Sequence, residues 1–284
     1  MTVLAIDWSG RRTGERRYLW TAEAADGELV GLACGRTRGE LAADLVARAA
    51  ERPGLVVGFD FSFSLPEWFL DQQGFAGAPE LWEAATRDGE DWLRDCAAPF
   101  WGRPGRPRPE LPQHLRVTEA GIAAVGGVRP KSTFQIGGAG SVGTGSLRGF
   151  PVLARLRAAG FCVWPIDAPA AAPVAVEIYP RLLTGAVVKS DPQARRAHLD
   201  ERHPGIAPEW RDLAINSEDA FDAAVSALVM SGHEHELRAL PVVDDPVVRR
   251  EGWVWSPAVS RVTSPRGRCG GGPPKRRSRE RGSR

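Results

Sequence analysis

Residues 3–10 read VLAIDWSG, a short apolar run that ends in an aspartate and a turn. Four consecutive apolar residues predict a buried strand. Residues 18–22 and 29–33 predict two further strands, with the tight-turn pair Asp26-Gly27 between them. Three short strands joined by short turns are typical of an antiparallel meander.

A helix and a second buried strand follow this meander. Thr37 is a favourable N-cap for a helix over residues 38–50, and Pro53-Gly54 would end it. Residues 55–60 read LVVGFD, a nearly all-apolar run that is typical of a strand buried on both faces. Later elements are expected as a helix at 151–159, strands at 162–166 and 174–179, helices at 193–201 and 218–231, and a short strand at 253–255. We therefore expect a mixed α/β fold with one sheet.

The pattern loosens over residues 65–149. This segment holds a Pro/Arg-rich stretch at 102–112 and a Gly-rich stretch at 137–149, with short helices expected at 66–73 and 79–96. Long irregular segments inside compact domains are usually functional, so we interpret it as an insertion that carries binding surface. We expect one domain over residues 1–256 and a disordered, basic, low-complexity tail over residues 257–284.

Composition and charge narrow the class of protein. A hydrophobic content of 43% and a charged content of 25% are ordinary for a soluble globular chain and exclude wholesale disorder. No apolar run approaches the ~18 residues that a membrane span needs. No secretory leader is visible, so we expect a cytoplasmic protein without a membrane partner. The net charge of +2 divides unevenly, because residues 266–284 carry +7 and residues 1–265 carry −5. An acidic body argues against a surface that coats nucleic acid generally.

Four acidic residues stand in apolar surroundings, where a carboxylate costs several kcal/mol unless it is paired or metal-bound. They are Asp7, Asp60, Glu177 and Asp222. The first two end predicted strands, the third lies inside one, and the fourth lies at the border of the apolar stripe of the helix at 218–231. No lysine adjoins them in the sequence and arginines adjoin only loosely. We infer that the missing cation is a metal.

A simpler explanation is open at each position. Asp7 and Asp60 could each begin a turn, Glu177 could point outward from an edge strand, and Asp222 could be solvated. The four together are harder to explain without a shared role.

Six segments, in order, resemble the family catalogued as domain of unknown function 429, described as predicted RNase H-like nucleases. They are AIDWSG (5–10), GFDFSFSLP (58–66), KSTFQ (131–135), SVGTGSL (141–147), EIYP (177–180) and DAFDAA (219–224). The resemblance covers about residues 1–256. It implies an RNase H-like mixed sheet, with three antiparallel strands and then parallel strands, flanked by helices.

The resemblance also implies a metal-dependent nuclease that hydrolyses phosphodiester bonds of DNA or RNA. Such nucleases usually bind two Mg²⁺ or Mn²⁺ ions about 4 Å apart, one activating water and the other stabilising the leaving oxygen. Carried over to this chain, Asp7 would bridge both ions, Asp60 and Glu177 would each hold one, and Asp222 would complete the shell. Hard oxygen ligands suit these ions and argue against zinc.

Residues near the Gly-rich loop are candidates for substrate binding. Residues 138–143 read GAGSVG and match GxGxxG, but residues 144–146 read TGS where a dinucleotide-binding helix would have to begin. A backbone cradle for a phosphate is the better functional interpretation, and a flexible connector is the alternative. Trp8 adjoins Asp7 and is a candidate for stacking on a base. The full predicted substrate-binding set is Trp8, Lys131, Ser132, Ser141 and Gly143.

Two other functions fit the same pattern. One is a nucleotide-binding kinase or ATPase of the related sugar-kinase and actin superfamily, whose first hairpin holds phosphates. Asp7-Trp8-Ser9-Gly10 departs from the Asp-x-Gly spacing of that hairpin. The other is a non-catalytic RNase H-like binding module, which retention of all four acids disfavours. The basic tail could recruit nucleic acid electrostatically under the leading hypothesis, or could have no specific role.

Overall fold

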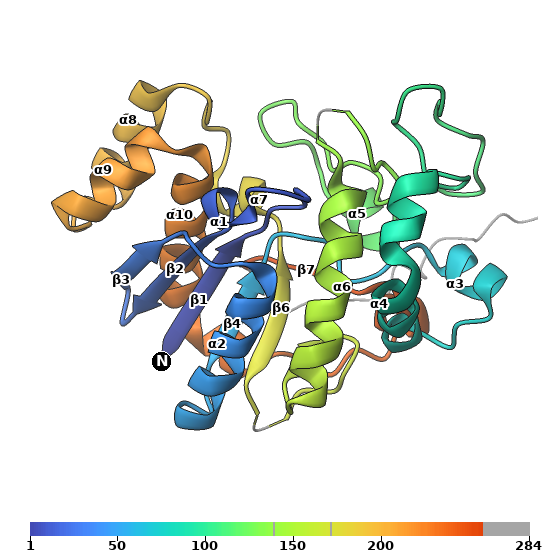
Figure 1. Ribbon diagram of the computed structural model, residues 1–284. Coiled ribbons are helices and arrows are strands. Elements are labelled where there is room, and N and C mark those ends of the chain that lie inside the picture. Colours follow the sequence, from blue (N-terminus) through green and yellow to red (C-terminus); the bar gives the residue numbers. More distant parts are fainter. Residues whose placement is uncertain (139, 171, 258–284) are drawn as a thin grey trace, which may run out of the picture.

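A computed structural model describes residues 1–138, 140–170 and 172–257 (Figure 1). The predicted basic tail lies outside the described residues, apart from Pro257. Across the described part of the chain, no helix combines the length and the apolar character that crossing a membrane requires.

A seven-stranded sheet forms the centre of the molecule, in the order β3-β2-β1-β4-β6-β5 with β7 also paired to β6. The pairs β1–β2 and β2–β3 are antiparallel, whereas β4, β5, β6 and β7 join in parallel. The strands are β1 (Thr2–Asp7), β2 (Trp20–Ala25), β3 (Glu28–Ala33), β4 (Val56–Phe59), β5 (Cys162–Trp164), β6 (Val174–Ile178) and β7 (Val254–Trp255). The predicted mixed sheet, three antiparallel strands followed by parallel ones in an RNase H-like arrangement, is confirmed.

Helices cover both faces of this sheet (Figure 1). One face packs against α2 (Arg38–Glu51), α3 (Glu67–Gln73), α4 (Ala78–Asp95) and α6 (Val142–Ala158). The other packs against α7 (Pro180–Thr184), α8 (Pro192–Arg202), α9 (Pro208–Asn216) and α10 (Glu218–Gly232). The remaining short helices are α1 (Glu15–Tyr18), α5 (Val117–Gly121), α11 (Glu234–Arg238) and α12 (Pro246–Glu251).

Strand alternation assigns side chains to these two layers. In β1, Val3 and Ala5 belong to the core on the α10 side, while Leu4 and Ile6 belong to the core on the α2 and α6 side. Such alternation is the period of two that every strand imposes. The same alternation determines which carboxylates lie on the same face of the sheet.

Helix α6 differs from the sequence expectation. The sequence predicts a helix that begins near Pro151, but α6 begins at Val142 and contains that proline. The prediction is wrong because Leu147, Phe150 and Leu153 form one buried face, and their burial outweighs the roughly 3 kcal/mol that an interior proline costs. The predicted insertion over residues 65–149 thus forms α3, α4, α5 and the first part of α6.

Candidate active site

The carboxyl ends of β1 and β4 place Asp7 beside Asp60. Ile6 and Phe59 are register partners, and the amide of Asp60 donates to the carbonyl of Ile6 at 3.1 Å. Both aspartates therefore continue the side of the sheet that faces α10. In the described part of the chain, neither carboxylate has a hydrogen-bond or ion-pair partner.

Helix α10 brings Asp222 to the same place. A Cβ on Gly58 of β4 would lie 2.7 Å from Sδ of Met230, which shows how closely α10 approaches the sheet. Asp222 is 9% exposed, and its Oδ2 accepts from the ammonium of Lys189. Its Oδ1 is buried without a hydrogen-bond partner among the described residues. A buried acceptor without a donor is costly and indicates a place for a cation or a proton.

The electrostatics of these acids show that they form a group. Burial raises the pKa of Asp7 well above its ordinary value, and the charges of Asp60, Asp222 and Asp219 raise it further. Burial likewise raises the pKa of Asp60 well above its ordinary value, with Asp222 as the largest charge contributor. The pKa of Asp222 is raised by burial, against the opposing effect of Lys189. Like charges that raise one another's pKa values are stabilised when a cation enters.

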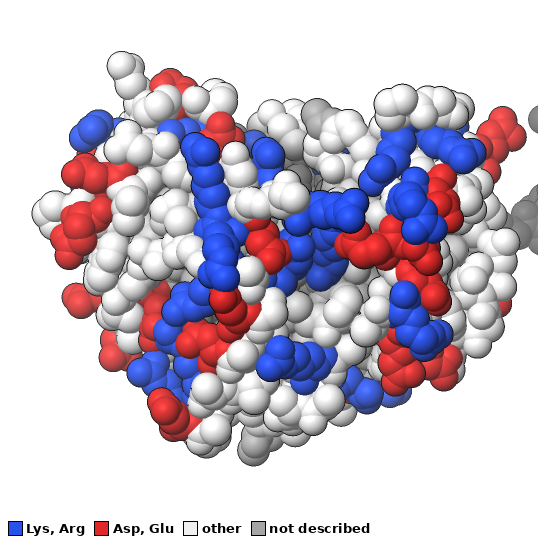
Figure 2. All heavy atoms as spheres, in the orientation of Figure 1, with Lys and Arg blue, Asp and Glu red and all other residues white. Residues whose placement is uncertain are grey.

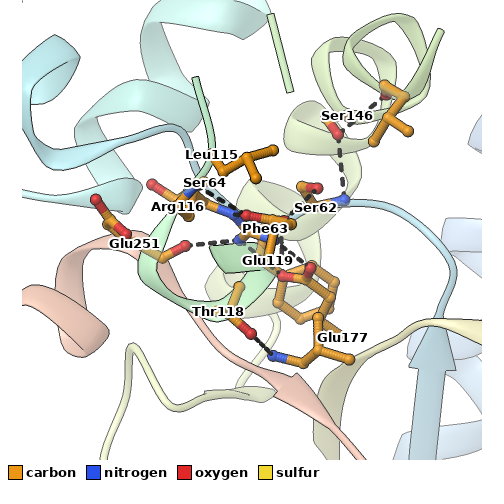
Figure 3. Close-up of polar contacts among 12 residues, drawn as sticks. Ser62, Phe63, Ser64, Leu115, Arg116, Thr118, Glu119, Ser146, Glu177 and Glu251 are labelled. Atoms are coloured by element: carbon orange, nitrogen blue, oxygen red, sulfur yellow. Dashed lines mark hydrogen bonds and ion pairs between the residues drawn. The ribbon is translucent and has the colours of Figure 1, made fainter. Parts of the chain in front are cut away.

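Glu177 lies on the opposite face of the sheet. It is the register partner of Phe59, one residue before Asp60, and so it shares the face that packs on α6. Its Oε2 accepts from the amide of Phe63 at 2.9 Å and from Nη1 of Arg116 at 2.9 Å (Figure 3). Burial raises the pKa of Glu177, and the charge of Arg116 opposes that rise.

Arg116 ties this second group together. Its guanidinium is fully buried and also binds the carboxylate of Glu119 and the carbonyl of Glu251, the latter at 2.7 Å (Figure 3). The Glu251 carboxylate in turn accepts from the amides of Glu67 and Val117 at the starts of α3 and α5. The cluster therefore links the insertion and the C-terminal helix α12 to strand β6.

The expectation that no cation accompanies the four acids is wrong for two of them. Lys189 pairs with Asp222 and Arg116 pairs with Glu177, at sequence separations of 33 and 61 residues. Neighbours in sequence could not reveal partners that tertiary folding supplies.

A pocket of about 720 Å³ opens at this edge of the sheet. Acidic lining comes from Asp7, Asp60, Asp219, Glu119 and Glu177. Basic lining comes from Arg11, Lys131 and Arg148. Figure 2 shows Lys and Arg side chains gathered over the middle of the viewed face, with acidic side chains beside them. The pocket thus offers both cation-binding and anion-binding groups.

The structure separates the predicted substrate-binding residues. Lys131 and Ser141 line the pocket. Ser132 is buried, and its hydroxyl accepts from the amide of Phe134 at 3.2 Å. The amide of Gly143 donates to the carbonyl of Gln135 at 3.0 Å, so it is already used within the protein.

Trp8 lines the pocket but is largely enclosed. Its indole N–H donates to the carbonyl of Gly145 at 3.0 Å, and its ring lies 4.7 Å from that of Phe61 between centroids. Only 8% of the residue is exposed. Its observed contacts are those of a packing residue between β1 and α6.

Sequence reasoning missed Lys189 and Arg116 as members of these clusters. Lysine is scarce among the 37 basic residues, with Lys131, Lys189 and Lys275 as its three positions. Lys189 pairs with Asp222 and Lys131 lines the pocket, so both lysines of the described residues lie at the site. Arg116 carried no signal in the sequence, because it lies in the irregular insertion.

Comparisons of the chain with protein-family models, with curated proteins and with solved structures found no match. In the described ranges, no set of three or more His, Cys, Asp or Glu residues is arranged to hold a metal ion. The donor chemistry nevertheless fits a hard divalent cation. Asp222 Oδ1 is buried without a donor, and the carboxylates of Asp7 and Asp60 are unpartnered in that part of the chain.

Proposed function

We propose that this protein is a metal-dependent nuclease that hydrolyses phosphodiester bonds of nucleic acid. One observation carries the proposal: Asp7 and Asp60 end two adjacent parallel strands, and their pKa values are raised by burial and by the charge of Asp222 on α10, whose own pKa burial also raises. Groups with such shifts in a cleft are candidates for chemistry. The resemblance to predicted RNase H-like nucleases supports the same function.

Asp7 and Asp60 would hold a Mg²⁺ or Mn²⁺ ion, with Asp222 Oδ1 as the third oxygen. The bound ion would supply Lewis-acid polarisation of the phosphate and a water of lowered pKa. The protein's own part is positioning. The two strands fix the aspartates, and α10 fixes Asp222 through its close packing on Gly58.

Basic residues in the pocket wall support a phosphate-bearing substrate. Arg148 is held by Glu90 and by the carbonyl of Gly10. Arg11 lies over the ring of Tyr18 at 4.0 Å, and both line the pocket. The Arg11 guanidinium could bind a phosphate and the Tyr18 ring could stack on a base, both on the same pocket wall as the acidic residues. The volume suits a nucleotide unit rather than a whole duplex.

The contacts of the Gly-rich loop do not favour the nucleotide-binding alternative. The first amides of α6 bond to the protein's own carbonyls, Val142 to Gly140 at 3.0 Å and Thr144 to Ser141 at 3.2 Å. A phosphate cradle needs such amides to point at the ligand.

The proposal is tested by cleavage of labelled single-stranded, duplex and branched DNA and RNA with Mg²⁺ or Mn²⁺. Wild type is compared with Asp7→Asn, which keeps the side-chain shape and removes the charge. We expect cleavage by wild type and a rate at least about 100-fold lower in the variant, since removing one electrostatic interaction with the reacting groups can slow a reaction that much. Asp212→Asn, at an exposed position on α9, is the matched control. Equal cleavage by Asp7→Asn and wild type would refute the proposal.

A further inference from the structure

Lys189 is the cation that the structure itself supplies to the acid group. Its ammonium donates to Oδ2 of Asp222, and both side chains are largely buried. The residue lies between α7 and α8, outside every strand that carries an acid. A buried ammonium is stable only when it is paired with a carboxylate, so the contact with Asp222 determines where the Lys189 side chain lies.

Two arginines hold the segment that carries Lys189. Arg195 is buried, and its guanidinium donates to the carbonyl of Lys189 and, through Nε at 2.9 Å, to that of Ile215. Arg181 donates to the carbonyl of Val187 at 2.8 Å. These contacts fix the backbone on both sides of the lysine. The backbone that carries Lys189 is therefore held in a fixed position next to Asp222.

The charge of Lys189 acts on the whole acid group. It lowers the pKa values of Asp7, Asp60, Asp219 and Asp222, opposing burial at each. A single positive charge thus already offsets part of the repulsion that would otherwise favour two divalent ions.

We propose that Lys189 takes the place of a second metal ion, so that the site binds one divalent cation beside Asp7 and Asp60. The ammonium supplies the second positive charge at Asp222. This inference rests on the proposed metal-dependent function and replaces the two-ion site that the resemblance implies with a one-ion site. Asp222 Oδ2 accepts from the lysine, and its Oδ1, which is buried without a partner among the described residues, would be left for the divalent ion.

The test is the number of Mn²⁺ ions bound, measured by titration calorimetry and by the electron paramagnetic resonance signal of free Mn²⁺. We expect wild type and Lys189→Arg to bind one ion per chain. Lys189→Met keeps the aliphatic stem, removes the charge and should bind two. Lys131→Met, which removes the same charge from the pocket wall, should still bind one.

Circular dichroism of each variant establishes that it is folded. Two ions in wild type, or one ion in folded Lys189→Met, would overturn the inference while leaving a metal-dependent nuclease in place. Absence of Mn²⁺ binding in every protein would instead remove the metal-dependent function itself. If Lys189→Met does not fold, the wild-type and Lys189→Arg stoichiometries decide between one ion and two.

Discussion

Arg116 and Glu177 show how a buried charge can be structural while lying close to a candidate active site. The guanidinium is fully buried and contacts two carboxylates and a carbonyl. Fully satisfied polar networks of this kind fix one arrangement of the chain, because each unpaired alternative is expensive. Glu177 thereby holds the amide of Phe63, three residues after Asp60.

Removing the buried cation should be strongly destabilising. Arg116→Met leaves Glu119 and Glu177 buried without their partner, and breaking such a pair costs about 3–5 kcal/mol. Urea unfolding followed by tryptophan fluorescence measures the change. Arg94→Met is the control, because that arginine is exposed and solvent screens its pairs with Asp91 and Asp95, so its removal should change stability little. Equal destabilisation of the two variants would contradict this account of Arg116.

Glu177 and Asp60 should differ in their effect on metal binding. Glu177→Gln keeps an oxygen for the Phe63 amide but weakens the interaction with Arg116, so we expect lower stability and an unchanged number of bound Mn²⁺ ions. Asp60→Asn should bind Mn²⁺ at least about tenfold more weakly, since a hard ion prefers a charged oxygen. Calorimetric titration of both variants measures this. If folded Glu177→Gln failed to bind Mn²⁺, Glu177 would be a metal ligand and not only a structural residue.

At the level of elements, α6 carries a glycine that packing requires. A Cβ on Gly149 would overlap the ring of Phe61, the residue after Asp60. Helix propensity alone favours alanine over glycine by about 1 kcal/mol. Overpacking costs about 1–3 kcal/mol, so the net effect of Gly149→Ala should be destabilising. The measurement is the midpoint of thermal unfolding.

Gly145→Ala is the matched control in the same helix. A Cβ there meets Trp8 Cδ1 at 3.6 Å and Phe61 Cβ at 3.9 Å, both ordinary van der Waals distances. Propensity should therefore prevail, and the variant should unfold at the wild-type temperature or above. Stabilisation by both substitutions would show that the Phe61 ring moves aside at little cost.

The α8 layer over α10 should be sensitive to acid. The rings of His198 and His203 lie 5.8 Å apart, and that of His198 lies 5.5 Å from Phe221 of α10. Burial and the charge of His198 lower the pKa of His203 to about 4. The folded state then binds protons less readily than the unfolded state, whose histidines titrate near about 6.5. Stability is present above that value and is lost as the pH falls toward 4.

His203→Gln isolates this contribution. It removes the titrating group, so the decrease in stability between pH 6.5 and pH 4 should be smaller in the variant than in wild type. Thermal unfolding at half-unit steps of pH measures the difference. His235→Gln, at an exposed position on α11, should follow the wild-type curve. Coincident curves for His203→Gln and wild type would show that other groups set the acid sensitivity.

Elements were predictable from sequence where local chemistry decides them. Thr37 caps α2 as expected, its hydroxyl accepting from the amide of Glu40, and Ser217 caps α10 through the same contact with the amide of Ala220. The start of α6 was not predictable, because burial against the sheet overrides Pro151. For the candidate site, the sequence predicted that Asp7 and Asp60 each end a buried strand, and the pairing of β1 with β4 brings them together. The separation of Glu177 depended on register, which places it one residue out of phase with Asp60.

At the scale of the molecule, the sheet determines where the acids lie, and the charge distribution determines how a phosphate backbone can approach them. The parallel strands bring acids to one edge, where crossover connections leave a crevice. The basic residues that line the pocket are confined to that place, whereas residues 1–265 as a whole carry a net charge of −5. A body of that charge repels a phosphate backbone at long range, over roughly 10 Å at ordinary ionic strength. Approach to the site therefore needs a positive charge from elsewhere.

Residues 266–284 carry a net charge of +7 and are the segment of the sequence that can supply this positive charge. Deleting them should weaken binding of duplex DNA and make the slope of log affinity against log salt less steep, by about 0.9 for each phosphate that the tail neutralises. Fluorescence anisotropy across a salt series measures both. The deletion should leave Mn²⁺ binding and the unfolding temperature near wild type, because the pocket lies within residues 1–257. An unchanged salt slope would show that the pocket-lining Arg11, Lys131 and Arg148 recruit the backbone without the tail.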